Sequence, residues 1–145
     1  MESKGSSNSR SGLSFIDLVR RYIHEILDRE ACNRQMMLLY RTGVYWTAFE
    51  RSAYRLEKCC GNASVIPMRI LGISHAVVTA GVEEDRLEVV LKGFDAVKDG
   101  FNEKVFLMRD ELDEAAYRSW HARKSASIEK AMQECKIPNR PGFPS

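Results

Sequence analysis

The chain lacks the apolar segments that mark membrane and secreted proteins. No apolar run among its 145 residues approaches the roughly 20 residues that a membrane-spanning helix needs. The first residues, MESKGSSNSRSG, also lack the apolar core of a secretory signal peptide. From these two absences we expect a cytoplasmic protein.

Residues in the spacing of a metal site are missing as well. The chain has four cysteines and three histidines. Cys59 and Cys60 are adjacent, Cys32 and Cys135 stand alone, and neither a CxxC spacing nor a pair of histidines completes a zinc site. We therefore expect free, mostly buried thiols in a reducing compartment, and no bound metal.

Motifs for catalysis are absent too. No GxxxxGK[ST] segment is present to hold a nucleotide phosphate. Glu83, Glu84 and Asp85 are consecutive, which fits a turn better than a two-metal centre. We expect His75 to pack or hydrogen-bond at a strand end and His121 to face solvent, and no spacing indicates an activated nucleophile. The sequence therefore predicts a protein that is not an enzyme and has no cofactor.

What is present is the composition of one globular domain. Apolar residues make up 44% of the chain and charged residues 29%, which is typical of a folded protein. The formal net charge is only +2, so any contact with nucleic acid must come from a local patch. We expect a single α+β domain at residues 13–136, between a disordered tail at 1–12 and a flexible tail at 137–145.

Hydrophobic periodicity and turn residues predict a small mixed β-sheet flanked by helices, with a long C-terminal helix. In chain order, the expected elements are a helix capped by Ser14; two strands within 36–49, bent at Gly43; a helix at 50–62; strands at 64–78 and 86–94; a loop at 95–104; a strand at 105–108; and a helix at 110–136. Pro67 favours an edge position for its strand. The connection at 79–85 is interpreted as a hairpin, with the end of a short helix as the alternative.

Basic residues gather in the first half of this domain. Arg51, Arg55 and Lys58 recur at helical spacing, which indicates one exposed side of their helix. Arg41 lies in the preceding strand, next to the predicted bend. Because only two glutamates oppose these four cations, residues 36–60 carry a net charge of +2 and form a candidate surface for phosphate contacts. The alternative for each residue is an ordinary solvated surface.

Two neighbouring aromatic residues, Tyr45 and Trp46, raise a question of burial. Neighbouring side chains in a strand point to opposite faces of the sheet, so one core cannot easily bury both rings. Either both faces of this strand are covered, or one ring faces something other than the core. An exposed ring could stack on a nucleic-acid base, which contributes about 1–3 kcal/mol per base.

The surrounding segment, LLYRTGVYWTAFERSA at 38–53, resembles the start of the mismatch-recognition domain of the MutS family. The matching positions are Leu38, Leu39, Tyr40, Arg41, Gly43, Tyr45, Trp46 and Phe49. Further along, IPM at 66–68 and GISHAV at 72–77 resemble a second segment of that domain, so the resemblance covers residues 15–80 in the family's order. It implies the fold of that reading domain without the family's ATPase.

The resemblance assigns roles to three strand residues. In the family, an aromatic ring stacks at the mismatch and a glutamate two positions later contacts the displaced base. Tyr45 holds the aromatic position and is expected to be exposed, Trp46 is expected to pack, and Thr47 replaces the glutamate. The stacking ring is kept and the base-reading acid is lost, so we expect little preference for mismatched duplexes.

Small stand-alone proteins similar to this MutS domain serve reverse transcriptases in diversity-generating retroelements. The resemblance therefore implies a non-catalytic nucleic-acid-binding accessory factor that assists such a reverse transcriptase. Phosphate contacts are expected from Arg41, Arg51 and Arg55, and contacts to DNA, RNA or an RNA/DNA hybrid from Tyr45, with Thr47 beside it. The alternative is a protein-interaction subunit that docks on the polymerase and never touches nucleic acid.

Overall fold

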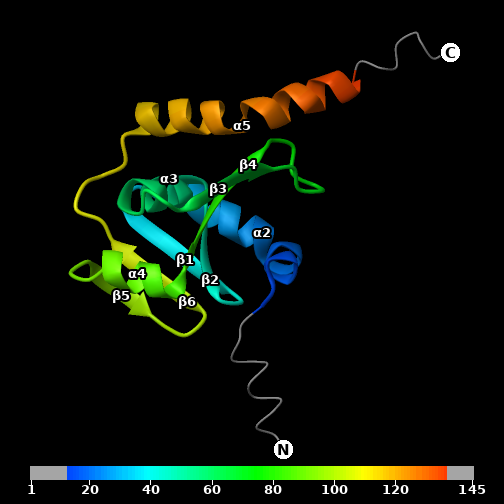
Figure 1. Cartoon of the computed structure of the whole chain (residues 1–145). Helices are drawn as coiled ribbons and strands as arrows, with labels where there is room; N and C mark the ends of the chain where they lie inside the picture. The colour runs from blue at the N-terminus through cyan, green and yellow to red at the C-terminus, as the bar shows by residue number, and fades with distance from the viewer. Residues whose placement is uncertain (1–12, 137–145) are drawn as a thin grey trace, which may run out of the picture.

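Six strands form one sheet in the order β3-β4-β2-β1-β6-β5, and every neighbouring pair is antiparallel (Figure 1). The structure, a computed structural model, describes residues 13–136, with side chains up to Ala131. Its elements are α2 (Phe15–Ala31), β1 (Met36–Thr42), β2 (Tyr45–Phe49), α3 (Glu50–Cys59), β3 (Ser64–Met68), β4 (Val77–Glu83), α4 (Glu84–Val90), β5 (Asp95–Asp99), β6 (Glu103–Leu107) and α5 (Glu114–Lys136). The tails predicted at 1–12 and 137–145 lie outside the described residues.

The predicted α+β class and the long C-terminal helix are confirmed, whereas the sheet is antiparallel throughout rather than mixed. The pairs β1–β2, β3–β4 and β5–β6 are each consecutive in the chain and are joined without a crossover. Such direct connections make antiparallel pairs, because parallel neighbours need a crossover of a dozen or more residues.

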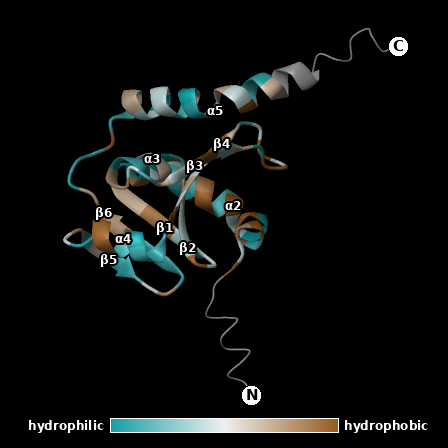
Figure 2. Cartoon of the chain, in the orientation of Figure 1, coloured by the Kyte–Doolittle hydropathy of each residue, from teal (hydrophilic) through white to brown (hydrophobic). Residues whose placement is uncertain are grey.

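Each face of the sheet is covered by its own helices. α2 packs on one face, here called the α2 face, where Leu18, Ile23 and Ile26 form a cluster with strand residues such as Phe49. α3, α4 and α5 cover the other face, here called the α3 face, whose larger cluster includes Trp46. Figure 1 shows α5 running across the molecule beside α3, and Figure 2 shows the hydrophobic β6 next to the hydrophilic edge strand β5. The central strand β2 is therefore buried from both sides.

The first half of the domain follows its sequence signals. Ser14 caps α2, because its Oγ accepts a hydrogen bond from the backbone N–H of Asp17 at 3.1 Å. β1 and β2 form a hairpin whose turn contains Gly43, with a φ of +69° that favours glycine. Pro67 lies in β3, which is an edge strand as predicted.

Two predictions for residues 79–94 are wrong. Residues 84–90 form helix α4 rather than part of a strand at 86–94, and β4 continues to Glu83 through the predicted hairpin connection. Leu87 and Leu91 are buried four residues apart while Val89 between them is exposed, which is helical periodicity. The β-branched pair at 89–90 locally favours a strand, and the packing of Leu87 on the α3 face overrides that preference.

Residues 95–104 are not a loop, because β5 pairs there with β6 along the edge of the sheet. All five residues of β5 are exposed. A strand without a buried face carries no alternating hydrophobic pattern, so the sequence offers no signal for it. The strand predicted at 105–108 is confirmed as part of β6.

The described residues also allow the predictions about thiols, metal ligands and membrane helices to be compared with the structure. Cys32, Cys59 and Cys60 are free thiols, of which Cys32 is exposed, Cys59 partly buried and Cys60 buried. Between residues 13 and 136 there is no group of three or more potential metal-ligating side chains. In the same part of the chain, every helix is too short or too polar to cross a membrane.

Candidate nucleic-acid interface

The β1–β2 hairpin separates the two neighbouring aromatic rings. Across the hairpin Trp46 pairs with Arg41 and Tyr45 pairs with Thr42, so the rings lie on opposite faces of the sheet. Trp46 is fully buried on the α3 face, whereas Tyr45 is 45% exposed at the tip of the hairpin. Val44, which precedes it in the turn, is 68% exposed. The predicted division into an exposed Tyr45 and a packed Trp46 is confirmed.

Arg41 lies on the same face as Trp46, and its guanidinium is fully engaged within the protein. Its Nε donates to the carbonyl oxygen of Phe101 at 2.7 Å, and its two Nη atoms donate to the two carboxylate oxygens of Glu84 at 3.1 Å each. The guanidinium carbon lies 4.7 Å from the Trp46 ring centroid and 4.2 Å from that of Phe101. With only 9% of its side chain exposed, Arg41 fastens the hairpin to α4 and to the β5–β6 turn.

The ion pair between Arg41 and Glu84 also shifts the pKa of the carboxyl. The hydrogen bonds from Arg41 hold the pKa of the Glu84 carboxyl below its ordinary value. Both charges are thus committed to each other, and Arg41 is not available as a phosphate ligand without breaking the pair. The structure therefore gives Arg41 a structural role at this end of the sheet.

Thr47 is an internal residue. It is buried on the α2 face, and its Oγ1 lies 2.8 Å from the Oγ1 of Thr42, with which it shares a hydrogen bond. The hydroxyl has its partner inside the protein, so Thr47 lies beneath the surface that Tyr45 presents. It offers neither a carboxylate nor an exposed hydroxyl to a base.

Arg51 and Arg55 are held by protein groups far from the hairpin tip. Arg51 donates to the backbone oxygen of Glu30 at 3.1 Å and to Glu114 at 2.9 Å, and the Glu114 hydrogen bond raises the pKa of the Arg51 guanidinium. Arg55 is buried, donates to the backbone oxygens at positions 34 and 110, and has its pKa lowered by burial. The prediction of one exposed basic side is therefore wrong for Arg55, although Lys58 is exposed.

Arg51 and Arg55 lie beyond the far end of β2 from Tyr45. β2 spans four residue steps from Tyr45 to Phe49, which is about 13 Å in an extended chain, and α3 begins beyond that end. The segment before α5 and α5 itself cover the two arginines, and this cover comes from residues more than 50 positions away in the sequence. A single phosphate-contacting surface that joins Tyr45, Arg51 and Arg55 is not formed.

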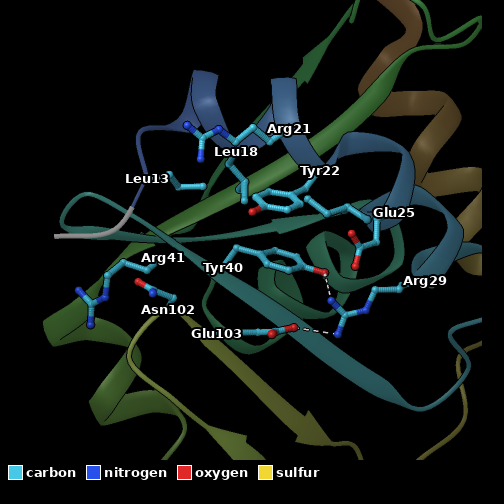
Figure 3. A pocket seen from close by; sticks show the side chains of 11 residues that line it. Leu13, Leu18, Arg21, Tyr22, Glu25, Arg29, Tyr40, Arg41, Asn102 and Glu103 are labelled. Carbon is cyan, nitrogen blue, oxygen red and sulfur yellow. Dashed lines mark hydrogen bonds and ion pairs between the residues drawn. The ribbon is translucent and has the colours of Figure 1, made fainter. Parts of the chain in front are cut away.

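A cavity on the α2 face lies beside the hairpin. This α2 pocket has a volume of about 710 Å³ and lies between α2 and the strands β1 and β6 (Figure 3). It is lined by Leu13, Leu18, Arg21, Tyr22, Glu25, Ile26, Arg29, Tyr40, Arg41, Asn102 and Glu103. Leu13 forms a backbone bridge to Thr42, the cross-strand partner of Tyr45, so the pocket adjoins the hairpin tip.

The charges around the α2 pocket are only partly paired. Arg29 donates to the Tyr40 hydroxyl at 3.3 Å and to Glu103 at 2.7 Å. Burial lowers the pKa of the Arg29 guanidinium, but the hydrogen bond to Glu103 and the electrostatic attraction of Tyr40, Glu103 and Glu25 together outweigh it, so the pKa is raised. Arg21 and Glu25 have no side-chain partner among the described residues. Among the described residues, the pocket thus offers a cation and a carboxylate without a hydrogen-bonded partner, together with the exposed ring of Tyr22.

Sequence reasoning missed this pocket, although one signal was present. Tyr22 fits the inward stripe of α2 by spacing, yet 42% of it is exposed, because it lies over the pocket rather than over the core. Arg21, Glu25 and Arg29 recur every four residues beside it, a pattern that reads equally well as a solvated helix face. Only the long-range pairing with Glu103, 74 positions away, identifies this face as a pocket wall.

A second cavity, of about 690 Å³, lies between α2, α3 and α5. At its wall Glu50 has a φ of +51°, and its carboxylate accepts a hydrogen bond from the backbone N–H of Val78 at 3.1 Å. The Nε2 of His121 lies 2.7 Å from the same carboxylate, so the prediction of a solvent-facing His121 is wrong. His75 hydrogen-bonds through Nδ1 to the adjacent Ala76 carbonyl just before β4, as predicted.

These polar contacts join secondary-structure elements. Glu50 ties the start of α3 to β4 and α5, while the fully buried Glu30 ties the end of α2 to α3 through the backbone N–H and hydroxyl of Ser52, at 2.9 and 2.6 Å. Because their oxygens are used by neighbouring protein groups, we assign the two carboxylates a structural role.

Comparison of the chain with protein-family models, with curated proteins and with solved structures finds no match. The resemblance to the MutS reading domain therefore rests on the sequence pattern alone.

Proposed function

We propose that this chain is a non-catalytic nucleic-acid-binding protein that contacts an unpaired or distorted segment with the tip of the β1–β2 hairpin and the adjoining α2 pocket. The observation that carries the proposal is the exposure of Tyr45 beside a fully buried Trp46. A half-exposed ring at a hairpin tip supplies a flat surface on which a base can stack. Arg21, which lines the adjoining pocket and has no side-chain partner among the described residues, supplies a cation for the backbone phosphate.

The role as an accessory factor of a retroelement reverse transcriptase is proposed on the resemblance alone. A gene for a reverse transcriptase next to this one, together with a near-repeat pair of template and target sequences, supports that role. Its absence from the neighbourhood argues for a different biological setting and leaves the binding proposal to its own test.

The binding proposal is tested by fluorescence anisotropy with single-stranded DNA, single-stranded RNA, an RNA/DNA hybrid, and matched and mismatched duplexes. Because counterion release accompanies phosphate contacts, affinity should fall steeply as salt rises. Tyr45→Ala should weaken binding by about 1–3 kcal/mol, and Tyr45→Phe, which keeps the ring, should retain most of the affinity. With Thr47 buried, mismatched and matched duplexes should bind about equally.

A matched control comes from the β3–β4 connection. Leu71 is fully exposed there, and β4 separates it from the Tyr45 end of the sheet by six residue steps, about 20 Å. Leu71→Ala should leave nucleic-acid affinity unchanged. Equal affinities for the Tyr45→Ala variant and the unmodified protein, with melting curves that show both folded, would exclude the hairpin as the contact surface.

The rival function, docking on a polymerase, is favoured by a different observation. Leu71 is fully exposed and Ile66 is half-exposed at the β3 edge of the sheet, away from the hairpin. Contiguous exposed apolar side chains are typical of protein contacts, and in this rival function both side chains would contact the polymerase. In that case a reverse transcriptase should bind with little dependence on salt, and Leu71→Ala rather than Tyr45→Ala should weaken the complex.

A further inference from the structure

We infer that the α2 pocket receives a single unpaired nucleobase and that the carboxylate of Glu25 makes guanine the preferred base. The inference rests on the proposed function, because it names the ligand of the same surface. It adds to stacking on Tyr45 a second contact, in which hydrogen bonds to the edge of one base recognise its identity.

The walls of the pocket suit a flat ring. Figure 3 shows the Tyr22 ring, carried by α2, and the Tyr40 ring, carried by β1, both directed into the space between helix and sheet. These two rings make no contact with each other in the described part of the chain, so the space between them is not closed by their own stacking. An unstacked base that enters this space finds the Tyr22 ring, which is 42% exposed, whereas the Tyr40 ring is buried in the core of the α2 face. An exposed aromatic ring is the usual support of a splayed-out base.

Two carboxylates line the pocket, and only one of them is free to read a base. Glu103 accepts from Arg29 at 2.7 Å with one oxygen and from Lys98 at 2.9 Å with the other. Glu25 has no hydrogen-bond partner among the described side chains, and its charge helps to raise the pKa of the nearby Arg29 guanidinium. Figure 3 places its carboxylate between the Tyr22 ring and Arg29, at the side of the space described above. The edge of a bound base is therefore met by an acceptor that is not already used.

The chemistry of this acceptor selects the base. An ionised carboxylate only accepts hydrogen bonds, and it can accept two side by side. Guanine presents two adjacent N–H donors on its Watson–Crick edge, N1–H and the exocyclic amine. Adenine and cytosine each present one amine beside a ring nitrogen acceptor, and uracil or thymine presents one N–H between two carbonyl oxygens that the carboxylate repels. Guanine alone uses both oxygens of Glu25.

The rest of the nucleotide has partners at the pocket mouth. Arg21 precedes Glu25 by one helical turn and has no side-chain partner in the described residues, so it is free for a phosphate. Asn102 lines the opposite side from the β5–β6 turn, where its amide can donate to a sugar or phosphate oxygen. The volume of about 710 Å³ leaves room for the base together with its sugar.

The test is competition anisotropy with nine-nucleotide oligothymidines that carry guanine, inosine, adenine or cytosine at the central position. Guanine should bind roughly 5- to 150-fold tighter than adenine or cytosine, the range of one bidentate base contact, and inosine, which lacks the exocyclic amine, should fall between them. Glu25→Gln, which presents one acceptor and one donor, should remove this preference and leave the affinity for plain oligothymidine within about 3-fold.

Tyr22 supplies a second, independent variant. Tyr22→Ala should reduce the guanine preference, while Tyr22→Phe should keep it. Tyr22 and Glu25 are both exposed on α2, so variants at these positions should fold. Equal affinities for all central bases, or a guanine preference that survives Glu25→Gln, overturns the inference while Tyr45-dependent binding keeps the proposed function. Complete absence of binding to any nucleic acid overturns both.

Discussion

The buried carboxyl of Glu30 should make the stability of this protein depend on pH in an unusual direction. Glu30 is fully buried at the end of α2, where it accepts hydrogen bonds from Ser52 and, at 3.4 Å, from the side-chain amide of Asn33. Burial raises its pKa from 4.5 to about 7, because the hydrogen bonds only partly offset the loss of solvation. At neutral pH the folded protein thus holds a carboxyl that is close to half protonated.

The size of the effect follows from the two pKa values. Between pH 4.5 and pH 7 the folded protein binds a proton at Glu30 that the unfolded chain has released. The free energy of unfolding therefore falls as pH rises through this window, and the contribution is lost above the folded pKa. A difference of about 2.5 between the pKa values corresponds to about 3 kcal/mol, at about 1.4 kcal/mol for each pH unit.

Urea denaturation at half-unit steps from pH 5 to pH 8 measures this slope. The range avoids the acid side, where the carboxylates of Glu84 and Glu114, whose pKa values are lowered by hydrogen bonds from arginine, lose their own contribution. Glu30→Gln has no proton to release, so its stability should change by about 3 kcal/mol less across the range. The exposed Glu25→Gln variant is the control and should keep the original slope.

The comparison uses slopes rather than absolute stabilities, because the amide of glutamine changes the hydrogen bond to Ser52 at every pH. A Glu30→Gln slope equal to that of the unmodified protein would refute the reasoning, since it would mean that Glu30 is ionised in the fold throughout. A stability that rises between pH 5 and 7 only in the unmodified protein would show the opposite sign and refute it as well.

Two further predictions concern Trp46 and Arg41 on the α3 face of the hairpin. Both are measured by chemical denaturation. Trp46→Ala should lower stability by about 3–5 kcal/mol, the usual cost of truncating a large buried aromatic side chain. Trp46→Phe should cost far less, because it also removes an indole N–H that has no acceptor among the described residues. Arg41→Lys should cost about 1–3 kcal/mol, because an ammonium cannot keep both bonds to Glu84 and the bond to the Phe101 carbonyl; an unchanged midpoint would show that the charge alone matters there.

Local signals explain why the first half of the fold could be predicted. Ser14 before an apolar helical stripe predicts α2, and Gly43 between two apolar runs predicts two strands with a bend between them, which form the β1–β2 hairpin in the structure. In each case the residues that determine the structure lie within a few positions of one another. The exposure of Tyr45 and burial of Trp46 also follow from local geometry, because strand neighbours point to opposite faces.

The second half and most of the candidate site depend on contacts that the sequence does not display. α4 is decided by the burial of Leu87 on the α3 face, and β5 by pairing with β6 although none of its residues is buried. Arg55 is an exposed cation by spacing and becomes buried because its partner at position 110 lies 55 residues away. The α2 pocket likewise requires β6 to lie opposite α2.

The burial of the matching positions also shows how far the MutS resemblance can carry a function. Leu39, Trp46 and Phe49 are fully buried and Arg41 is locked between two rings and Glu84, so each of them is explained by folding stability. Any protein with this hairpin and these covering helices would favour the same residue types at these positions. Tyr45 differs, because a half-exposed ring contributes little to the core. Folding stability therefore does not explain the identity of Tyr45, and we expect variants at the buried positions to report on folding rather than on binding.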